Sequence, residues 1–157
     1  MHTYYFAILL PSLSYSLPVS HFSSKSLDDV DKKIAAPFLN KLGYSRSTPR
    51  AVRYGPTKFG GVNMHQLKDI QGSGQILQLL KHLRVQSPFQ KMWLIALHWA
   101  QLQSGFHTPL LQDPKAPAPH LESLYISSLR EFLASINGSI VTEHSYTIPM
   151  QRVHDRW

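Results

Sequence analysis

The chain of 157 residues contains no cysteine. This absence excludes disulfide bonds, thiol nucleophiles and every zinc site that uses a thiolate ligand. Long apolar runs are also missing, because the run from Tyr4 ends at Pro11, far short of the ~20 residues that a membrane-spanning helix needs. We therefore expect no thiol chemistry and no membrane partner.

Residues 1–25 are an apolar, serine-rich lead-in segment whose first 24 residues carry no Lys, Arg, Asp or Glu. A secretory signal peptide would place positive charge before its apolar run and a small-x-small cleavage site after it, and neither feature is present. We expect a protein that stays inside the cell, in the cytoplasm or the nucleus.

Acidic residues are few, and the resulting positive charge is concentrated in the middle of the chain. Sixteen Lys and Arg stand against nine Asp and Glu. Between Lys32 and Lys91 there are eleven basic residues and one acid, Asp69. Such a charge favours a polyanionic partner; charge alone would allow nucleic acid first and an anionic membrane surface second, and nucleic acid is the partner that we predict. A solvated basic face that only aids solubility is the alternative.

Residues 43–62 form a basic, aromatic loop in which Gly and Pro permit tight turns. Proteins bind single strands without sequence preference by neutralising phosphates and stacking aromatic rings on bases. The predicted nucleic-acid-binding residues are Tyr44, Arg46, Arg50, Arg53, Tyr54 and Lys58. Phe59 is a further candidate for stacking. The alternative is that the arginines bind nearby carbonyls and the rings fill the core.

Apolar periodicity and capping residues predict a mainly α fold with about four amphipathic helices, the basic Gly- and Pro-rich irregular loop and a short extended C-terminal tail. The first helix is expected to begin at Ser26 as N-cap and to kink or divide at Pro37 before it stops at Gly43. A capping box of Asn63 and Gln66 predicts the start of the second helix. Its apolar face would comprise Leu67, Ile70, Leu77, Leu80 and Leu83.

The third helix has the strongest signals, with Ser87 as N-cap, Pro88 at its first position and Gly105 at its end. Trp93 and Trp99 are expected to anchor it. Its broad apolar face contains Met92, Ile95, Ala96, Trp99 and Leu102, widened by Trp93 and Leu97. This pattern predicts a helix that is buried nearly all round and forms the centre of the core.

The chain is therefore expected to contain a helical core over residues 26–105, with the basic loop inside it. Residues 106–120 are rich in proline and are predicted to be an extended linker. Residues 121–157 would hold a fourth helix that stops at Asn137–Gly138, followed by an extended tail.

No motif in the sequence predicts catalysis, a metal or a cofactor. Gly55 to Gly60 has the glycine spacing of a phosphate-binding loop, but Gly61 and Val62 follow in place of Lys and Ser or Thr. The nine histidines lack the HExxH spacing, and no serine has the glycines of a nucleophile elbow. We expect these glycines to serve turns and packing, and the chain not to be an enzyme.

The segment LGYSRSTPRAVRYGPTKFGGV, residues 42–62, resembles a region downstream of the polymerase core in reverse transcriptases of retroelement polyproteins from microbial eukaryotes. Further pieces are similar to segments that occur in the same order in such polyproteins: SYSLPVSHFS, the QG of Gln71 and Gly72, the HLR of residues 82–84, SLREFLASINGSI and the terminal QRVHDRW. The resemblance runs from Ser14 to Trp157.

The resemblance implies a fragment that follows the catalytic part, because the YxDD motif, whose two aspartates bind the polymerase metals, is absent from the sequence. Its implied role is to hold template and primer, or to brace the polymerase, beside or behind the thumb. The lead-in would pack against the remainder of the polyprotein. The competing hypotheses are an independent helical protein-interaction module and the remnant of a decayed element.

Overall fold

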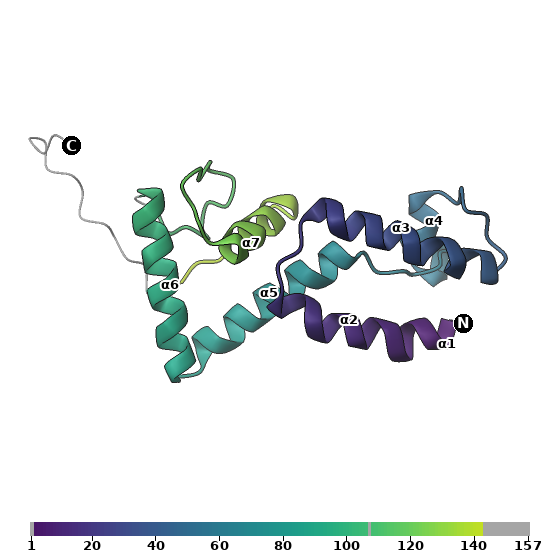
Figure 1. Cartoon of the computed structure of the whole chain (residues 1–157), viewed down its shortest axis with the longest axis horizontal. Coiled ribbons are helices and arrows are strands. Elements are labelled where there is room, and N and C mark those ends of the chain that lie inside the picture. Colours follow the sequence, from purple (N-terminus) through teal and green to yellow (C-terminus); the bar gives the residue numbers. More distant parts are fainter. Residues whose placement is uncertain (1, 107, 143–157) are drawn as a thin grey trace, which may run out of the picture. The chain divides into compact units, whose positions relative to one another are not determined.

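The structure is a computed structural model that describes residues 2–106 and 108–142 and is mainly helical, without a strand in these residues (Figure 1). The four predicted helices occur as α3 (Ser24–Lys41), α5 (Leu67–Arg84), α6 (Pro88–Ser104) and α7 (Leu124–Ser135). The mainly α fold is confirmed. Further helical segments occupy the lead-in and the basic loop, so the number of helices exceeds the predicted four.

The chain divides into two compact units, Met1–Gln75 and Ile76–Trp157, whose boundary falls within α5. This division differs from the predicted one. The expected core of residues 26–105 is shared between the two units, and the lead-in belongs to the first unit.

The lead-in is one nearly continuous helical run: α1 (His2–Tyr4), the π-helical η1 (Tyr5–Leu9), α2 (Leu10–Ser16) and the 3-10 helix η2 (Leu17–Val19). Tyr5 is 4% exposed and packs in a cluster with Phe38 of α3. Its hydroxyl accepts a hydrogen bond from the backbone N–H of His65 over 3.1 Å. The lead-in is therefore part of the core of the first unit.

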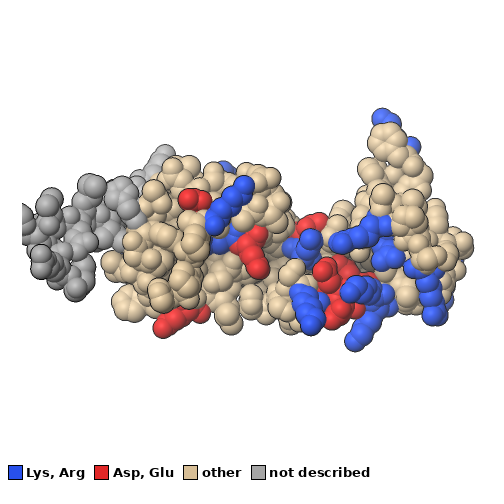
Figure 2. Space-filling view, turned by 90° about the horizontal axis from the view of Figure 1, so that it is seen from above, with Lys and Arg blue, Asp and Glu red and all other residues tan. Residues whose placement is uncertain are grey.

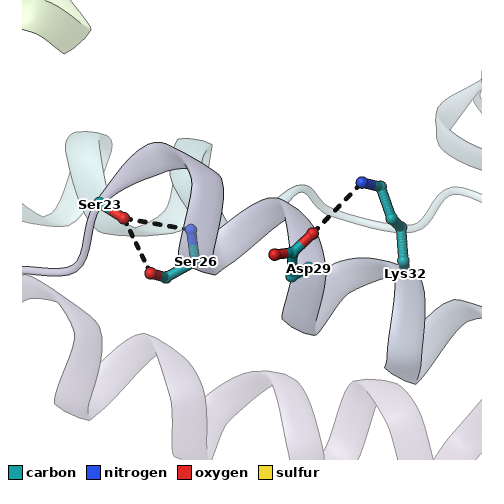
Figure 3. A network of polar contacts seen from close by, with 4 residues as sticks. All are labelled: Ser23, Ser26, Asp29 and Lys32. Carbon is teal, nitrogen blue, oxygen red and sulfur yellow. Dashed lines mark hydrogen bonds and ion pairs between the residues drawn. The ribbon is translucent and has the colours of Figure 1, made fainter.

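α3 begins one turn earlier than predicted. Ser23, not Ser26, is the N-cap, and its hydroxyl oxygen accepts a hydrogen bond from the backbone N–H of Ser26 over 3.2 Å (Figure 3). One turn further on, Lys32 forms an ion pair with Asp29 (Figure 3). α3 continues through Pro37 as one helix, so of the two predicted outcomes, a kink or a division, the division is wrong.

The predicted C-terminal stop of α3 is correct, whereas the predicted N-terminal cap of α5 is not. Gly43 has a φ of 82° and follows α3, as predicted for a helix stop. The predicted capping box at Asn63 is wrong, because Asn63 has a φ of 57° and its N–H donates to the carbonyl of Gly55. The N–H of Leu67 instead donates to the carboxylate of Asp31 on α3.

α3, α5 and the lead-in meet in a second cluster of the first unit, formed by Leu17, Leu27 and Leu67 with Leu13, Ile34 and Ile70 against it. Gly74 of α5 lies against the ring of Pro18, where a Cβ atom would collide. Gly74 thus permits close packing of α5 against the lead-in. Leu77, which the periodicity placed on the apolar face of α5, is 69% exposed.

The core of the second unit lies between α7, the second half of α5 and one side of α6. Its buried members are Leu79, Leu111, Leu129, Leu133 and Ile140, with Trp93 and Leu97 of α6 packed against them. The predicted burial of the opposite side of α6 is wrong, because Met92, Ile95 and Trp99 are 62–67% exposed. α6 instead packs in the core through the side that carries Trp93 and Leu97, and the ring of Trp93 contacts Tyr125 of α7.

Residues 108–120 are not an extended linker. Leu110 and Leu111 are 4% and 3% exposed and join the core of the second unit. The guanidinium of Arg130, on α7, donates to the carbonyls of Asp113 and Ala116 over 3.1 and 2.6 Å. These contacts fold the proline-rich segment onto α7. Most of the predicted C-terminal tail, residues 143–157, lies outside the described residues.

Candidate nucleic-acid interface

The basic loop is closed by backbone hydrogen bonds. It contains α4 (Arg50–Tyr54) and the 3-10 helix η3 (Thr57–Phe59). After η3 the chain returns along the end of α4, where the N–H of Val62 donates to the carbonyl of Val52 over 2.8 Å. The N–H of Met64 donates to the carbonyl of Arg53 over 3.1 Å. The loop is therefore closed by hydrogen bonds between its own backbone groups.

Three glycines make this closure possible. Gly61 lies directly against the backbone of Gly55, and a Cβ atom on either residue would collide with a backbone carbonyl. Gly60 has a φ of 78°, in the left-handed region that glycine adopts without strain. The prediction that these glycines serve turns and close packing is confirmed.

Apolar residues at the base of the loop fix it to the first unit. Val62 and Met64 are each 4% exposed and lie in the cluster with Tyr5 and Phe38. Tyr54 is half-buried and packs against the same cluster. The loop is therefore anchored to the core of the first unit through its base.

Four of the six predicted site residues are on the outside of this loop: Tyr44, Arg46, Arg50 and Lys58. Phe59, at the tip of η3, is 81% exposed, whereas Tyr44 is 36% exposed. The ammonium of Lys58 lies 6.0 Å from the centre of the Phe59 ring. The loop thus presents a cation beside an exposed aromatic ring, the pairing that binds a phosphate next to a stacked base.

The other two predicted residues, Arg53 and Tyr54, are half-buried and have structural contacts. The guanidinium of Arg53 donates to the carbonyl of Thr48 over 3.4 Å. The guanidinium of Arg50 lies over the Tyr54 ring, 5.8 Å from its centre, and donates to the side chain of Gln66 over 3.1 Å. Because Arg50 and the core cover much of Tyr54, Phe59 is the better stacking surface.

Electrostatically, the first unit is the basic part of the protein, with nine Lys and Arg against four Asp. On the face that Figure 2 presents, the blue Lys and Arg atoms gather mainly at its right-hand side, over the first unit. Among the described residues the one ion pair is Lys32 with Asp29, so no carboxylate lies within 4.0 Å of Arg46, Arg50 or Lys58 there.

One carboxyl group of the first unit, that of Asp31, is buried near the loop. Asp31 is 7% exposed, and the loss of solvation raises the pKa of its carboxyl. The hydrogen bond from Leu67 and the charge of Arg50 oppose this shift of the pKa without cancelling it. Asp31 thus accepts the hydrogen bond of Leu67 and, among the described residues, forms no ion pair within 4.0 Å with the exposed cations of the loop.

The structure also adds residues that the predicted site did not include. Lys41, the last residue of α3, is exposed and immediately precedes the loop. Lys25 and Lys33 are exposed on the same helix. Lys33 and Lys41 belong to the basic stretch that begins at Lys32, but which side of α3 faces solvent depends on its packing.

The remaining surfaces of the described residues carry little chemistry. No group of three or more His, Asp or Glu side chains in residues 2–106 and 108–142 is placed to hold a metal ion. A cavity of about 20 Å³ in the second unit, lined by Leu97, His98 and Gln101 among others, has room for a single water molecule. No helix in the described part of the chain is long and apolar enough to cross a bilayer.

Comparison of the chain with protein-family models, with curated proteins and with solved structures gave no match. The resemblance of the loop segment to retroelement reverse transcriptases thus stays a hypothesis that depends on the quoted residues alone.

Proposed function

We propose that the first unit binds single-stranded or primed nucleic acid, without sequence preference, through the loop of residues 43–62. The observation that carries this proposal is the exposed triad of Arg46, Arg50 and Lys58 on a closed, core-anchored loop, with no carboxylate within ion-pair distance among the described residues. Phe59, which is 81% exposed, is the stacking ring of the site.

Binding would draw on two independent sources of free energy. Each cation that neutralises a phosphate releases condensed counterions, which makes affinity steeply dependent on salt. A base stacked on Phe59 contributes about 1 to 3 kcal/mol and depends little on salt. Because the loop is already closed in the free protein, binding would lose little conformational entropy in ordering it.

The resemblance to reverse transcriptase polyproteins suggests where this activity is used. In that setting the chain would be a non-catalytic part that holds template and primer beside the polymerase, with the rest of the polyprotein as its partner. Catalysis would reside in a segment that carries the two aspartates. The loop binds RNA or DNA in this proposal, because neither phosphates nor base faces distinguish them.

Fluorescence anisotropy with labelled single-stranded oligonucleotides at several salt concentrations tests the proposal. Replacing Arg46, Arg50 and Lys58 with Gln should flatten the slope of log affinity against log salt by about 2 units, since each cation on a single strand contributes about 0.7. Phe59→Ala should cost about 1 to 3 kcal/mol of binding free energy and leave the slope unchanged.

A matched control removes the same charge from the second unit. Lys81, Arg84 and Lys91 are exposed there, and their replacement with Gln lowers the net charge equally. This control should keep the parental slope if the loop is the site. A folded loop variant that retains both parental affinity and parental slope would refute the proposal. Equal losses in both triple variants would show that net charge alone attracts the oligonucleotide.

A further inference from the structure

α6 carries a strip of large apolar side chains that are more than half exposed among the described residues; one of them, Phe89, also has its ring centre 5.7 Å from that of His82 on α5. Four of them, Phe89, Met92, Ile95 and Trp99, are 60–67% exposed, and Leu102 is 55% exposed. Ala96 lies between them and is exposed as well. The spacing of three and four residues places all six on one side of the helix, opposite the Trp93 side that packs in the core. These six residues are called the α6 strip below.

The α6 strip exposes more contiguous apolar area than single apolar residues scattered on a protein surface do. Side chains of about 200 Å² each, exposed by 55–67%, leave roughly 600 Å² of contiguous apolar area. Monomeric proteins rarely expose patches larger than a few hundred Å². Two such strips in contact would remove roughly 1,200 Å² from water, which is the lower limit for a specific protein–protein interface.

The positions of the strip residues are symmetric about the middle of the strip. About a centre between Ile95 and Ala96, Phe89 corresponds to Leu102 and Met92 corresponds to Trp99. A two-fold axis at this centre would place each of these residues opposite its counterpart on a second, antiparallel copy of α6. Trp99 would then meet the thioether of Met92, a favourable sulfur–aromatic contact. Ala96 at the crossing point would permit close approach of the helices.

The single charged side chain of α6 adds a small preference for the antiparallel over the parallel arrangement. Lys91 is the one Lys, Arg, Asp or Glu in α6. In a parallel pair the two Lys91 ammonium groups would lie side by side, about 8–10 Å apart at the helix spacing. In the antiparallel pair they are also offset by about 14 Å along the axis, so their repulsion, which is screened over about 8 Å in physiological salt, is weaker still.

We infer that the α6 strip is a homodimer interface, in which two copies of this chain pair antiparallel through α6 about a two-fold axis at Ile95 and Ala96. A membrane surface fits less well, because interfacial helices carry Lys and Arg on their polar side, whereas the opposite side of α6 is packed in the core. The inference concerns the second unit and does not depend on the proposed nucleic-acid interface.

Sedimentation equilibrium of the full chain over a range of concentrations tests the dimer. We expect association in the micromolar range and a rise in the dissociation constant of at least about 30-fold for Met92→Glu or Trp99→Lys, as for loss of a hot-spot residue. Leu77→Glu is the matched control, because Leu77 is 69% exposed on α5 and lies outside the strip. It should dimerise like the parent.

Mixing the two strip variants tests the orientation. In the antiparallel pair, position 92 of the Met92→Glu copy faces position 99 of the Trp99→Lys copy, so opposite charges meet. The symmetry-related contact joins the unchanged Trp99 of the first copy to the unchanged Met92 of the second. The mixture should therefore form a heterodimer, while each variant alone stays monomeric. A parallel pair would bring no opposite charges together and would not be rescued.

The absence of cysteine makes a crosslinking test specific. Under oxidising conditions Ala96→Cys should form a disulfide dimer, because the two positions are offset by only about 1.5 Å along the axis. Phe89→Cys should not, since its two positions are about 20 Å apart along the axis. Monomeric parent protein at all concentrations, a dimer that the strip variants leave unchanged, or crosslinking by both or neither cysteine variant would overturn the inference.

Discussion

Asp31 of α3 accepts a hydrogen bond from the backbone N–H of Leu67, the first residue of α5, over 3.0 Å. The two residues are far apart in sequence, so the N-terminus of α5 is capped across the fold and not by its own flanking residues. An exposed cap and a cap that lies in the core have different pH dependences. Asp31, at 7% exposure, belongs to the second kind.

Asp31 should make the first unit less stable at neutral than at mildly acidic pH. Burial raises the pKa of its carboxyl in the folded protein, with Asp28 and Asp69 adding to the shift and Arg50 opposing it. The folded state thus favours the protonated form, so the free energy of unfolding decreases as pH rises from the ordinary pKa through the raised pKa. Asp31→Asn should remove this component of the pH dependence in urea unfolding.

The matched variant Asp31→Ala tests the cap itself. Alanine cannot accept the hydrogen bond from Leu67, so this variant should lose about 1 kcal/mol relative to Asp31→Asn at neutral pH. Equal stability of the two variants would show that the N–H of Leu67 donates its hydrogen bond to water when the side chain of residue 31 cannot accept it. An unchanged pH profile in Asp31→Asn would mean that other carboxyl groups cause it.

Gly61→Ala should open the basic loop. The new methyl group would collide with the backbone of Gly55, and the cost of such overpacking is about 1 to 3 kcal/mol. We expect a lower free energy of unfolding together with a loss of oligonucleotide affinity. Gly60→Asn is the control, because no atom lies near its Cβ position and asparagine tolerates a φ of 78°. Equal effects of both substitutions would contradict the role of the Gly55–Gly61 contact.

The two tryptophans of α6 should differ in their effect on folding. Trp93 is half-buried and its ring centre lies 5.2 Å from that of Tyr125, whereas Trp99 is 62% exposed. Trp93→Ala should cost about 2 to 3 kcal/mol of stability, and Trp99→Ala less than about 0.5 kcal/mol. Unfolding is measured at dilutions where the midpoint no longer depends on protein concentration, since association adds stability. The reverse order would place Trp99 in the core.

Arg130→Ala should release the proline-rich segment from α7. Arg130 is 5% exposed and donates to the carbonyls of Asp113 and Ala116. Their loss should cost about 1 to 3 kcal/mol and expose residues 113–119 to limited proteolysis. Lys115→Ala, which removes one exposed hydrogen bond to Asn137 from the same segment, should cost less than about 0.5 kcal/mol. Unaltered proteolysis of the Arg130 variant would show that the segment is held by Leu110 and Leu111 alone.

The sequence alone predicted the elements whose signals are local. Apolar periodicity located α3, α5, α6 and α7. The Ser87 cap and the Gly43 and Gly105 stops are where the residue types place them, because caps and left-handed glycines depend on neighbours within a few residues. The composition of residues 43–62 predicted a turn-rich basic loop for the same reason.

Tertiary structure decided which side of each helix is buried and which group each buried polar side chain binds by a hydrogen bond. α6 is apolar on nearly all sides, so periodicity cannot indicate which side faces the core, and contact with Tyr125 selects Trp93 over Trp99. The cap of α5 and the folded state of the proline-rich segment depend on Asp31 and Arg130, which are distant in sequence from the groups they bind. The folded chain also decides which residues of the loop are exposed. Arg46, Arg50 and Lys58 lie on its outside, whereas Arg53 and Tyr54 are half-buried and support it.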